Sequence, residues 1–250
     1  MTENQIKTDA LRTDIRESVR IFAERLFDAL GSNLQSITVV GSSLTADFHV
    51  GRSDINTVCV LGERTLQSLK ALAALTKQMR KRRISAPLLM TKEYIERSRD
   101  VFGIELLDLQ LTHATIYGDD PFEGLEFTNS DVRLQCEREL KATLIRLRQG
   151  FVASAANTKL VRDILVSAAV SLVPLLRAML WLKDIDRPKS AKDVLSKAAQ
   201  HFGIDTTPVA DARNLRYEKT KLDRIQTEQA FESVYATVDK LAVIVDELKV

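Results

Sequence analysis

The sequence predicts an α+β N-terminal half followed by an all-α, antiparallel helical half. In the first half, apolar residues at helical spacing alternate with short β-branched runs, whereas from Asp131 onward only helical spacing occurs. The 250 residues include only 9 glycines and 5 prolines, 45% are hydrophobic, and the net charge is +2. This composition is typical of a helix-rich globular protein and excludes whole-chain disorder, collagen and a nucleic-acid coat held by bulk charge.

Helices and strands are expected to alternate in the N-terminal half. Apolar residues recur at helical spacing over 9–30 and again over 64–82. Thr91 is expected to cap a brief helix that ends near residue 98. Strands are predicted where apolar residues, often β-branched, run together between turn-forming residues. These strands cover 36–40, 55–61, 86–90, 104–111 and, as an edge strand, 114–118.

The C-terminal half is expected to contain helices only. Pro174 lies inside the second of them and predicts a kink. The longest uncharged apolar run, 164–176, is too short to span a bilayer, so we interpret it as part of a buried helix and expect no membrane association. The expected helices cover 131–153, 158–184, 190–202, 207–218 and 225–249.

The change of pattern sets the domain boundary. Residues 123–130 contain turn-forming Gly, Asn and Ser and form the best candidate linker. We therefore predict an α/β domain over 1–125 and a helical bundle domain over 126–250.

Cysteine usage and the N-terminus predict a cytoplasmic protein. Cys59 and Cys136 lie far apart, without the spacing of a disulfide framework or a zinc site. The first eight residues are polar and lack the apolar core of a signal peptide. The chain also contains no P-loop, G-x-G-x-x-G or G-x-S-x-G motif, so the corresponding ATPase, dinucleotide-binding and hydrolase classes lack their motifs.

A glycine-serine turn and a later acidic position carry the predicted chemistry. Gly41 and Ser42 follow the strand 36–40, and eleven residues separate Ser42 from Asp54. A Gly-Ser turn lets backbone N–H groups and a hydroxyl approach a phosphate closely, and a helix starting at Ser43 would add its positive end. An acid at the start of the next strand could then hold Mg²⁺ beside those phosphates.

A third acid is expected on the predicted strand 104–111. Glu105 and Asp108 are flanked there by apolar residues, where a carboxylate is costly unless it has a partner or a metal. Two residues three apart on a strand point to opposite faces, so only one of them could join Asp54. We favour Asp108.

These residues resemble the signature of the polymerase beta type nucleotidyltransferase superfamily over residues 30–120, and the rest is similar to the helical half of aminoglycoside-type nucleotidyltransferases. The resemblance implies an α+β nucleotidyltransferase-type domain, a mixed sheet with flanking helices, followed by an all-α antiparallel helical bundle. It implies Mg²⁺-dependent transfer of a nucleoside monophosphate from a nucleoside triphosphate, ATP first, to a hydroxyl of an unidentified acceptor. The implied roles are nucleotide binding by Gly41, Ser42, Ser43 and Ser53, metal binding by Asp54, Asn56 and Asp108, and catalysis by Asp54 with Asp108 or Glu105.

One position departs from the family pattern. The second acid of the family's acid-apolar-acid triplet is Asn56 in this chain. An amide carries no charge and binds a hard cation more weakly than a carboxylate does. The alternative hypothesis is therefore a catalytically degenerate relative that binds a nucleotide or a protein partner.

The charged and apolar segments indicate whether nucleic acid or a second copy of the chain is expected as a partner. Residues 80–83 are all basic, but they end a predicted helix, where cations complement the helix dipole, and no aromatic residue suited to base stacking lies nearby. Nucleic acid is therefore not expected as a partner. The apolar faces of the helices over 131–153 and 158–184 allow a homodimer without requiring one.

Overall fold

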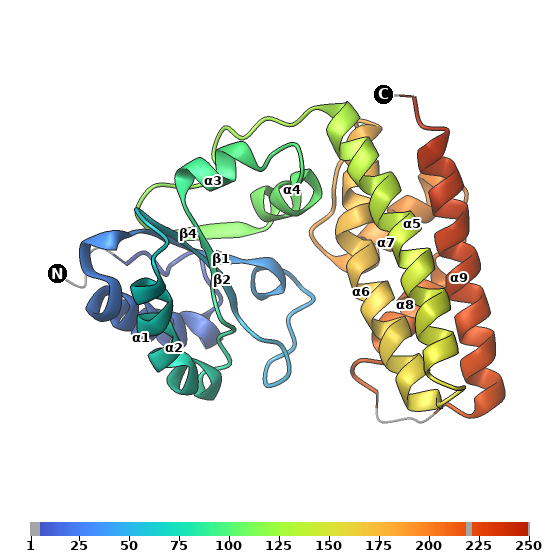
Figure 1. The fold of residues 1–250 in the computed structure, drawn as a ribbon, viewed down its shortest axis with the longest axis horizontal. Coiled ribbons are helices and arrows are strands. Elements are labelled where there is room, and N and C mark those ends of the chain that lie inside the picture. The colour runs from blue at the N-terminus through green and yellow to red at the C-terminus, as the bar shows by residue number, and fades with distance from the viewer. Residues whose placement is uncertain (1–5, 219–221, 250) are drawn as a thin grey trace. The chain divides into compact units, whose positions relative to one another are not determined.

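The computed structural model describes residues 6–218 and 222–249; residues 1–5, part of the polar N-terminus, lie outside this range. The chain divides into two compact units. The α/β unit comprises the chain up to Asp100 together with Leu106–Glu126, and the helical unit comprises Val101–Glu105 and the chain from Phe127 onward (Figure 1). The domains 1–125 and 126–250 remain our proposal for the folding domains.

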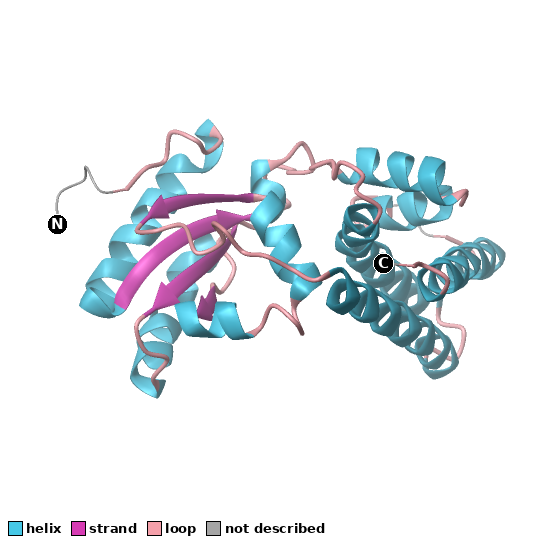
Figure 2. Ribbon diagram, turned by 90° about the horizontal axis from the view of Figure 1, so that it is seen from above, coloured by secondary structure: helices cyan, strands magenta, loops and turns pink. Residues whose placement is uncertain are grey.

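The α/β unit is built on a mixed four-stranded sheet (Figure 2). Its strand order is β3-β2-β1-β4. Strand β1 is antiparallel to both β2 and β4, while β2 and β3 are parallel. The predicted strands over 36–40, 55–61, 86–90 and 114–118 are confirmed, with β4 at an edge. The bounds are Leu34–Val40 for β1, Asn56–Leu61 for β2, Leu88–Met90 for β3 and His113–Tyr117 for β4.

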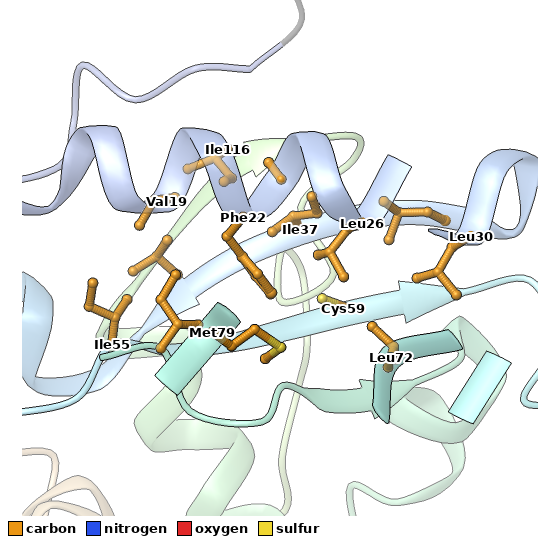
Figure 3. Close-up of a cluster of buried hydrophobic side chains, with 14 of the residues drawn as sticks. Val19, Phe22, Leu26, Leu30, Ile37, Ile55, Cys59, Leu72, Met79 and Ile116 are labelled. Carbon is orange, nitrogen blue, oxygen red and sulfur yellow. The ribbon is translucent and has the colours of Figure 1, made fainter. Parts of the chain in front are cut away.

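Two helices form a hydrophobic core against one face of this sheet (Figure 3). Helix α1 contributes Phe22 and Leu26, and α2 contributes Leu72 and Met79. They pack against strand residues that include the fully buried Cys59. Burial of large apolar side chains such as these contributes roughly 1.5–3 kcal/mol each. The helices and turns of this part are α1 (Thr13–Leu30), η2 (Gly31–Asn33), η3 (Gly41–Leu44), α2 (Leu66–Lys81) and α3 (Lys92–Arg97).

The predicted strand over 104–111 is wrong: the segment forms helix α4, Gly103–Leu111. Its apolar run is also compatible with helical spacing, because Ile104, Leu107 and Leu111 recur at intervals of three and four. Leu, Glu and Gln are good helix formers, and only one residue of the run is β-branched. Consequently Glu105 and Asp108 lie on one side of a helix, not on opposite faces of a sheet.

The helical unit contains five long or medium helices among its described residues. Helix α6 packs against each of the others, and α5 also packs against α9. Helix α6 is the one described helix that is long and apolar enough to cross a membrane, but 61% of that stretch is buried inside the protein, as expected for a core helix. Pro174 lies within α6, and the kink there remains a prediction. The helices are α5 (Asn129–Ala153), α6 (Thr158–Leu182), α7 (Ala191–Phe202), α8 (Thr207–Asn214) and α9 (Arg224–Asp246).

Side chains cap most of the described helices. The Thr91 hydroxyl accepts a hydrogen bond from the Tyr94 N–H, which confirms the predicted start of α3. Asp223 and Gln226 form a reciprocal capping box at the start of α9.

Both cysteines are free, and burial raises the pKa of the Cys59 and Cys136 thiols to about 12, so neither is a reactive thiolate at neutral pH.

Candidate functional site

The Gly-Ser turn directly follows β1 and is set by backbone geometry. Gly41 has a φ of 76°, a conformation that L-residues with a side chain rarely adopt. Its N–H donates to the Thr112 carbonyl at 2.9 Å, which fixes the start of η3. The Ser43 hydroxyl is buried and donates to the Val40 carbonyl at 3.4 Å. The half-buried Ser42 hydroxyl makes no hydrogen bond within the described chain, so this turn, the Gly41–Ser43 turn, presents a free hydroxyl.

The second half of the predicted motif lies beside this turn. Ile55 is buried in the core, and its neighbours Asp54 and Asn56 are exposed. Asn56 is the register partner of Val40, and its amide nitrogen lies 3.8 Å from the position that a Cβ on Gly41 would occupy. The structure therefore brings the Asn56 amide next to the turn, where a carboxylate would stand in the family pattern.

Ser53 has a structural partner. Its side chain is mostly buried, and its hydroxyl accepts a hydrogen bond from the His49 N–H at 3.0 Å. This bond closes the loop that leads into β2. Ser53 therefore shapes the loop that carries Asp54, and its role in nucleotide binding remains a prediction.

Sequence analysis missed the residue that contacts Asp54. The Arg83 guanidinium lies 3.7 Å from the Asp54 carboxylate, and its Nε donates to the Ser53 carbonyl at 3.3 Å. A further guanidinium nitrogen donates to the Gly51 carbonyl. The Arg83 main chain is also fixed, because its carbonyl accepts from the Ile55 N–H at 2.7 Å. The predicted metal ligand Asp54 thus already has an arginine as its ion-pair partner.

The predicted third acid is not on the sheet. No Asp or Glu occurs on the four described strands, and β3, the strand next to β2, reads Leu-Leu-Met. Asp108 and Glu105 lie on α4. The Glu105 carboxylate accepts a 2.7 Å hydrogen bond from Gln135, whose own oxygen accepts from the Ile104 N–H at 3.0 Å. Glu105 therefore has a structural partner in the helical unit.

The residues present do not fit a two-metal centre. No group of three or more His, Cys, Asp or Glu residues suited to a metal ion occurs in 6–218 and 222–249. Asp54 is the one carboxylate that the α/β unit places in the predicted triplet, and Asn56 offers only a neutral amide oxygen. Two Mg²⁺ ions bridged by carboxylates need more negative charge than these two side chains supply.

A histidine-carboxylate pair flanks the turn on its other side. His113 is the register partner of Val40 on β4, so it stands in the same row of the sheet as Asn56. Its Nδ1 lies 3.1 and 3.0 Å from the carbonyls of Leu109 and Gln110 at the end of α4, and its Nε2 lies 2.7 Å from Asp120. Because a carbonyl only accepts, Nδ1 carries hydrogen and caps α4. Nothing in the sequence spacing pointed to this pair.

Comparison with known proteins identifies the fold. No protein-family profile matches the chain, and no curated protein matches its sequence. In three dimensions the chain is similar to spectinomycin adenyltransferase AAD(9) from Enterococcus faecialis, solved with ATP and spectinomycin. The match has a TM-score of 0.58 and 12% identity, and it covers 92% of this chain and 99% of the other. At this identity the likeness shows the fold: a nucleotidyltransferase-type α/β part followed by a helical part, as predicted.

Proposed function

We propose that this protein is nucleotidyltransferase-like and binds a nucleoside triphosphate, ATP first, at the Gly41–Ser43 turn. The observation that carries the proposal is the turn itself, which combines a glycine at positive φ with the unpartnered Ser42 hydroxyl. Such a turn lets a phosphate approach the backbone closely. The turn occurs in a fold shared with an adenyltransferase that was solved with ATP.

The donor set favours binding over catalysis. Transfer of a nucleotidyl group relies on positioning and on neutralising the charge that develops on the phosphates, which two metal ions ordinarily supply. Here Asn56 replaces one acid, Arg83 contacts Asp54, and none of the strands in 6–218 and 222–249 carries a third acid. This geometry therefore best supports the alternative hypothesis raised by Asn56. The protein would then be a catalytically degenerate module that binds a nucleotide.

Active transfer remains the second candidate. The observation that favours it is the similar structure, which was solved with both ATP and spectinomycin. In that case Mg²⁺ would be held by Asp54 and Asn56 with Asp108 as the third ligand. The acceptor would be a hydroxyl compound.

Calorimetric titration tests the nucleotide site. We expect ATP, GTP, CTP or UTP to bind the wild type and to bind Ser42→Ala about tenfold more weakly, because one hydrogen bond of about 1.4 kcal/mol is lost. Ser167→Ala is the matched control, since Ser167 is an exposed serine of α6 whose hydroxyl makes no hydrogen bond to the described residues. Failure of all four nucleotides to bind would contradict the proposal.

Pyrophosphate release separates the two candidates. The protein would be incubated with each nucleotide, Mg²⁺ and spectinomycin as a trial acceptor. The degenerate module predicts no release from the wild type, with metal binding gained in Asn56→Asp because that change restores the second carboxylate. Release by the wild type would establish transfer and overturn the degenerate assignment.

We also propose a cytoplasmic location, which fits two free cysteines in a reducing compartment.

Self-association through α5 and α6 remains a prediction. Sedimentation of the intact protein at several concentrations tests it.

A further inference from the structure

Arg83 occupies a backbone position that normally selects glycine. Helix α2 ends in a Schellman motif, in which the Ile84 N–H donates to the Met79 carbonyl and the Arg83 N–H to the Arg80 carbonyl, both at 3.0 Å. Met79 and Ile84 are buried and complete the motif's apolar contact. Arg83 has a φ of 57°, where a side chain is unfavourable and glycine is the usual residue.

The Arg83 guanidinium makes contacts that a glycine could not make. It donates to the carbonyls of Gly51 and Ser53 and contacts the Asp54 carboxylate at 3.7 Å. Three groups of the loop before β2 thus converge on one cation. The side chains of Arg83 and Asp54 remain 43% and 57% exposed, so a ligand at the loop can reach the guanidinium.

This cation stands where a metal-dependent site needs an open carboxylate. A divalent ion bound to Asp54 would lie close to the guanidinium and be repelled by it, and the neighbouring Asn56 adds no negative charge. A guanidinium is itself a good phosphate ligand, because it offers several donors in one plane and is always charged. The surrounding segment is favourable to anions as well, since no Asp or Glu occurs between Arg64 and Lys92.

We propose that Arg83 replaces the metal as the phosphate-binding cation of this site, so that the protein binds its nucleoside triphosphate without a divalent ion. The inference rests on the proposed nucleotide binding at the Gly41–Ser43 turn. It adds which group neutralises the negative charge of the phosphates. Arg83 binds the phosphate oxygens, Asp54 and the loop carbonyls hold its guanidinium, and the Ser42 hydroxyl is a second phosphate donor.

The test is a calorimetric titration of ATP in EDTA and in excess Mg²⁺. The wild type is expected to bind in both buffers with dissociation constants within about twofold of each other. Arg83→Gly is expected to weaken binding at least tenfold in both buffers while keeping or raising the melting temperature, because glycine suits the positive φ. Lys81→Gln is the matched control: it removes an adjacent exposed charge that has no partner in the described structure, and a change below about threefold is expected.

The outcomes separate this inference from the proposed function. Binding that requires Mg²⁺ would overturn the inference and leave the nucleotide site intact, whereas no binding in either buffer would overturn both. Equal binding by Arg83→Gly and the wild type would also overturn the role of Arg83. Titration of the protein alone with Mn²⁺, followed by electron paramagnetic resonance, gives a second readout. We expect no bound Mn²⁺, and Mn²⁺ binding that Asp54→Ala abolishes would contradict the proposal.

Discussion

The two units use their polar side chains differently. In the helical unit the Arg177 guanidinium donates to the carbonyls of Pro188 and Lys189, and Gln135 bonds at both ends of its amide. In the α/β unit, by contrast, the side chains of Ser42 and Asn56 make no hydrogen bond within the described residues, although they adjoin a fixed turn. Polar groups that hold a fold have partners inside it. Ser42 and Asn56 are therefore available to a ligand.

The strongest test of this contrast is Arg177→Met in the helical unit. Arg177 is only 7% exposed, and its removal leaves the loop carbonyls of Pro188 and Lys189 without their charged donor. We expect the free energy of unfolding to fall by about 3 kcal/mol, measured by urea denaturation. Arg146→Met, at an exposed arginine of α5, is expected to cost less than about 1 kcal/mol. Equal losses would contradict the structural role of Arg177.

Gln135→Leu should have the next largest effect. Without the Gln135 oxygen, the buried Ile104 N–H loses its acceptor, and Glu105 loses its donor. A loss of about 2 kcal/mol is expected, because a buried donor is left unsatisfied. Gln149→Leu, at an exposed glutamine of α5, is the control and should be nearly neutral. A neutral Gln135→Leu would show that α4 does not depend on this amide.

A matched pair on the sheet sharpens the contrast within the α/β unit. The Thr57 hydroxyl is buried without a partner among the described residues, whereas the equally buried Thr38 hydroxyl bonds to Thr115 at 3.0 Å. Thr57→Val is expected to raise the free energy of unfolding by about 1 kcal/mol, and Thr38→Val to lower it by about 1 kcal/mol. Thermal and urea unfolding measure both. Destabilisation by Thr57→Val would show that this hydroxyl has a role in the fold.

An ion-pair cluster of the helical unit is expected to make its stability depend on pH. Lys141 on α5 lies 2.6 Å from Glu137 and 3.0 Å from Asp246 of α9. Its hydrogen bond lowers the pKa of Glu137 below 4.5, with Arg133 adding to the effect, and the same bond raises the pKa of Lys141 above 10.5, with Asp246 adding to it.

A lowered carboxyl pKa contributes stability that is present above its unfolded value and lost as the pH falls through the folded value. The stabilising effect of Glu137 should therefore fade below pH 4.5, and that of Lys141 above pH 10.5. The slope of the free energy of unfolding against pH reports how many more protons the unfolded state binds than the folded state. Lys141→Gln is expected to reduce this number on the acid side by a fraction of one proton. An unchanged slope would contradict the assignment, and urea unfolding across the acid range measures it.

The smallest effects are expected at the Gly41–Ser43 turn and the neighbouring Asn56. Ser42→Ala and Asn56→Ala should each change the free energy of unfolding by no more than about 0.5 kcal/mol, because neither side chain has a partner in the described structure. Urea denaturation measures the change. A loss above 1 kcal/mol would show that these groups stabilise the fold.

The sequence predicts the parts of the fold that local physics determines. A few neighbouring residues determine helical periodicity, the Thr91 cap and the β-branched strands. For this reason α3, β1 and β2 were predicted with nearly correct bounds. The run over 104–111 was not, since a short apolar segment fits a strand or a helix equally well. The segment forms helix α4, and this places Glu105 and Asp108 on a helix instead of a strand.

The site was predictable only in its backbone. The Gly41 turn and the proximity of Asn56 follow from spacing and strand pairing. The contact between Arg83 and Asp54 depends on an arginine at a left-handed helix end, where sequence rules expect glycine. The pair of His113 and Asp120 depends on where α4 ends. Arg83 and Asp54 belong to segments far apart in sequence. His113 and Asp120 lie seven residues apart, but their contact requires the chain to turn back after β4.

Localising the bound nucleotide tests the central claim most directly. Backbone amide resonances would be followed by nuclear magnetic resonance as ATP is added to the isotope-labelled protein in EDTA. We predict the largest shifts at Gly41, Ser42 and Ser43, together with a shift of the Arg83 Nε resonance. Saturable shifts confined to the helical unit, with the turn unchanged, would contradict the account.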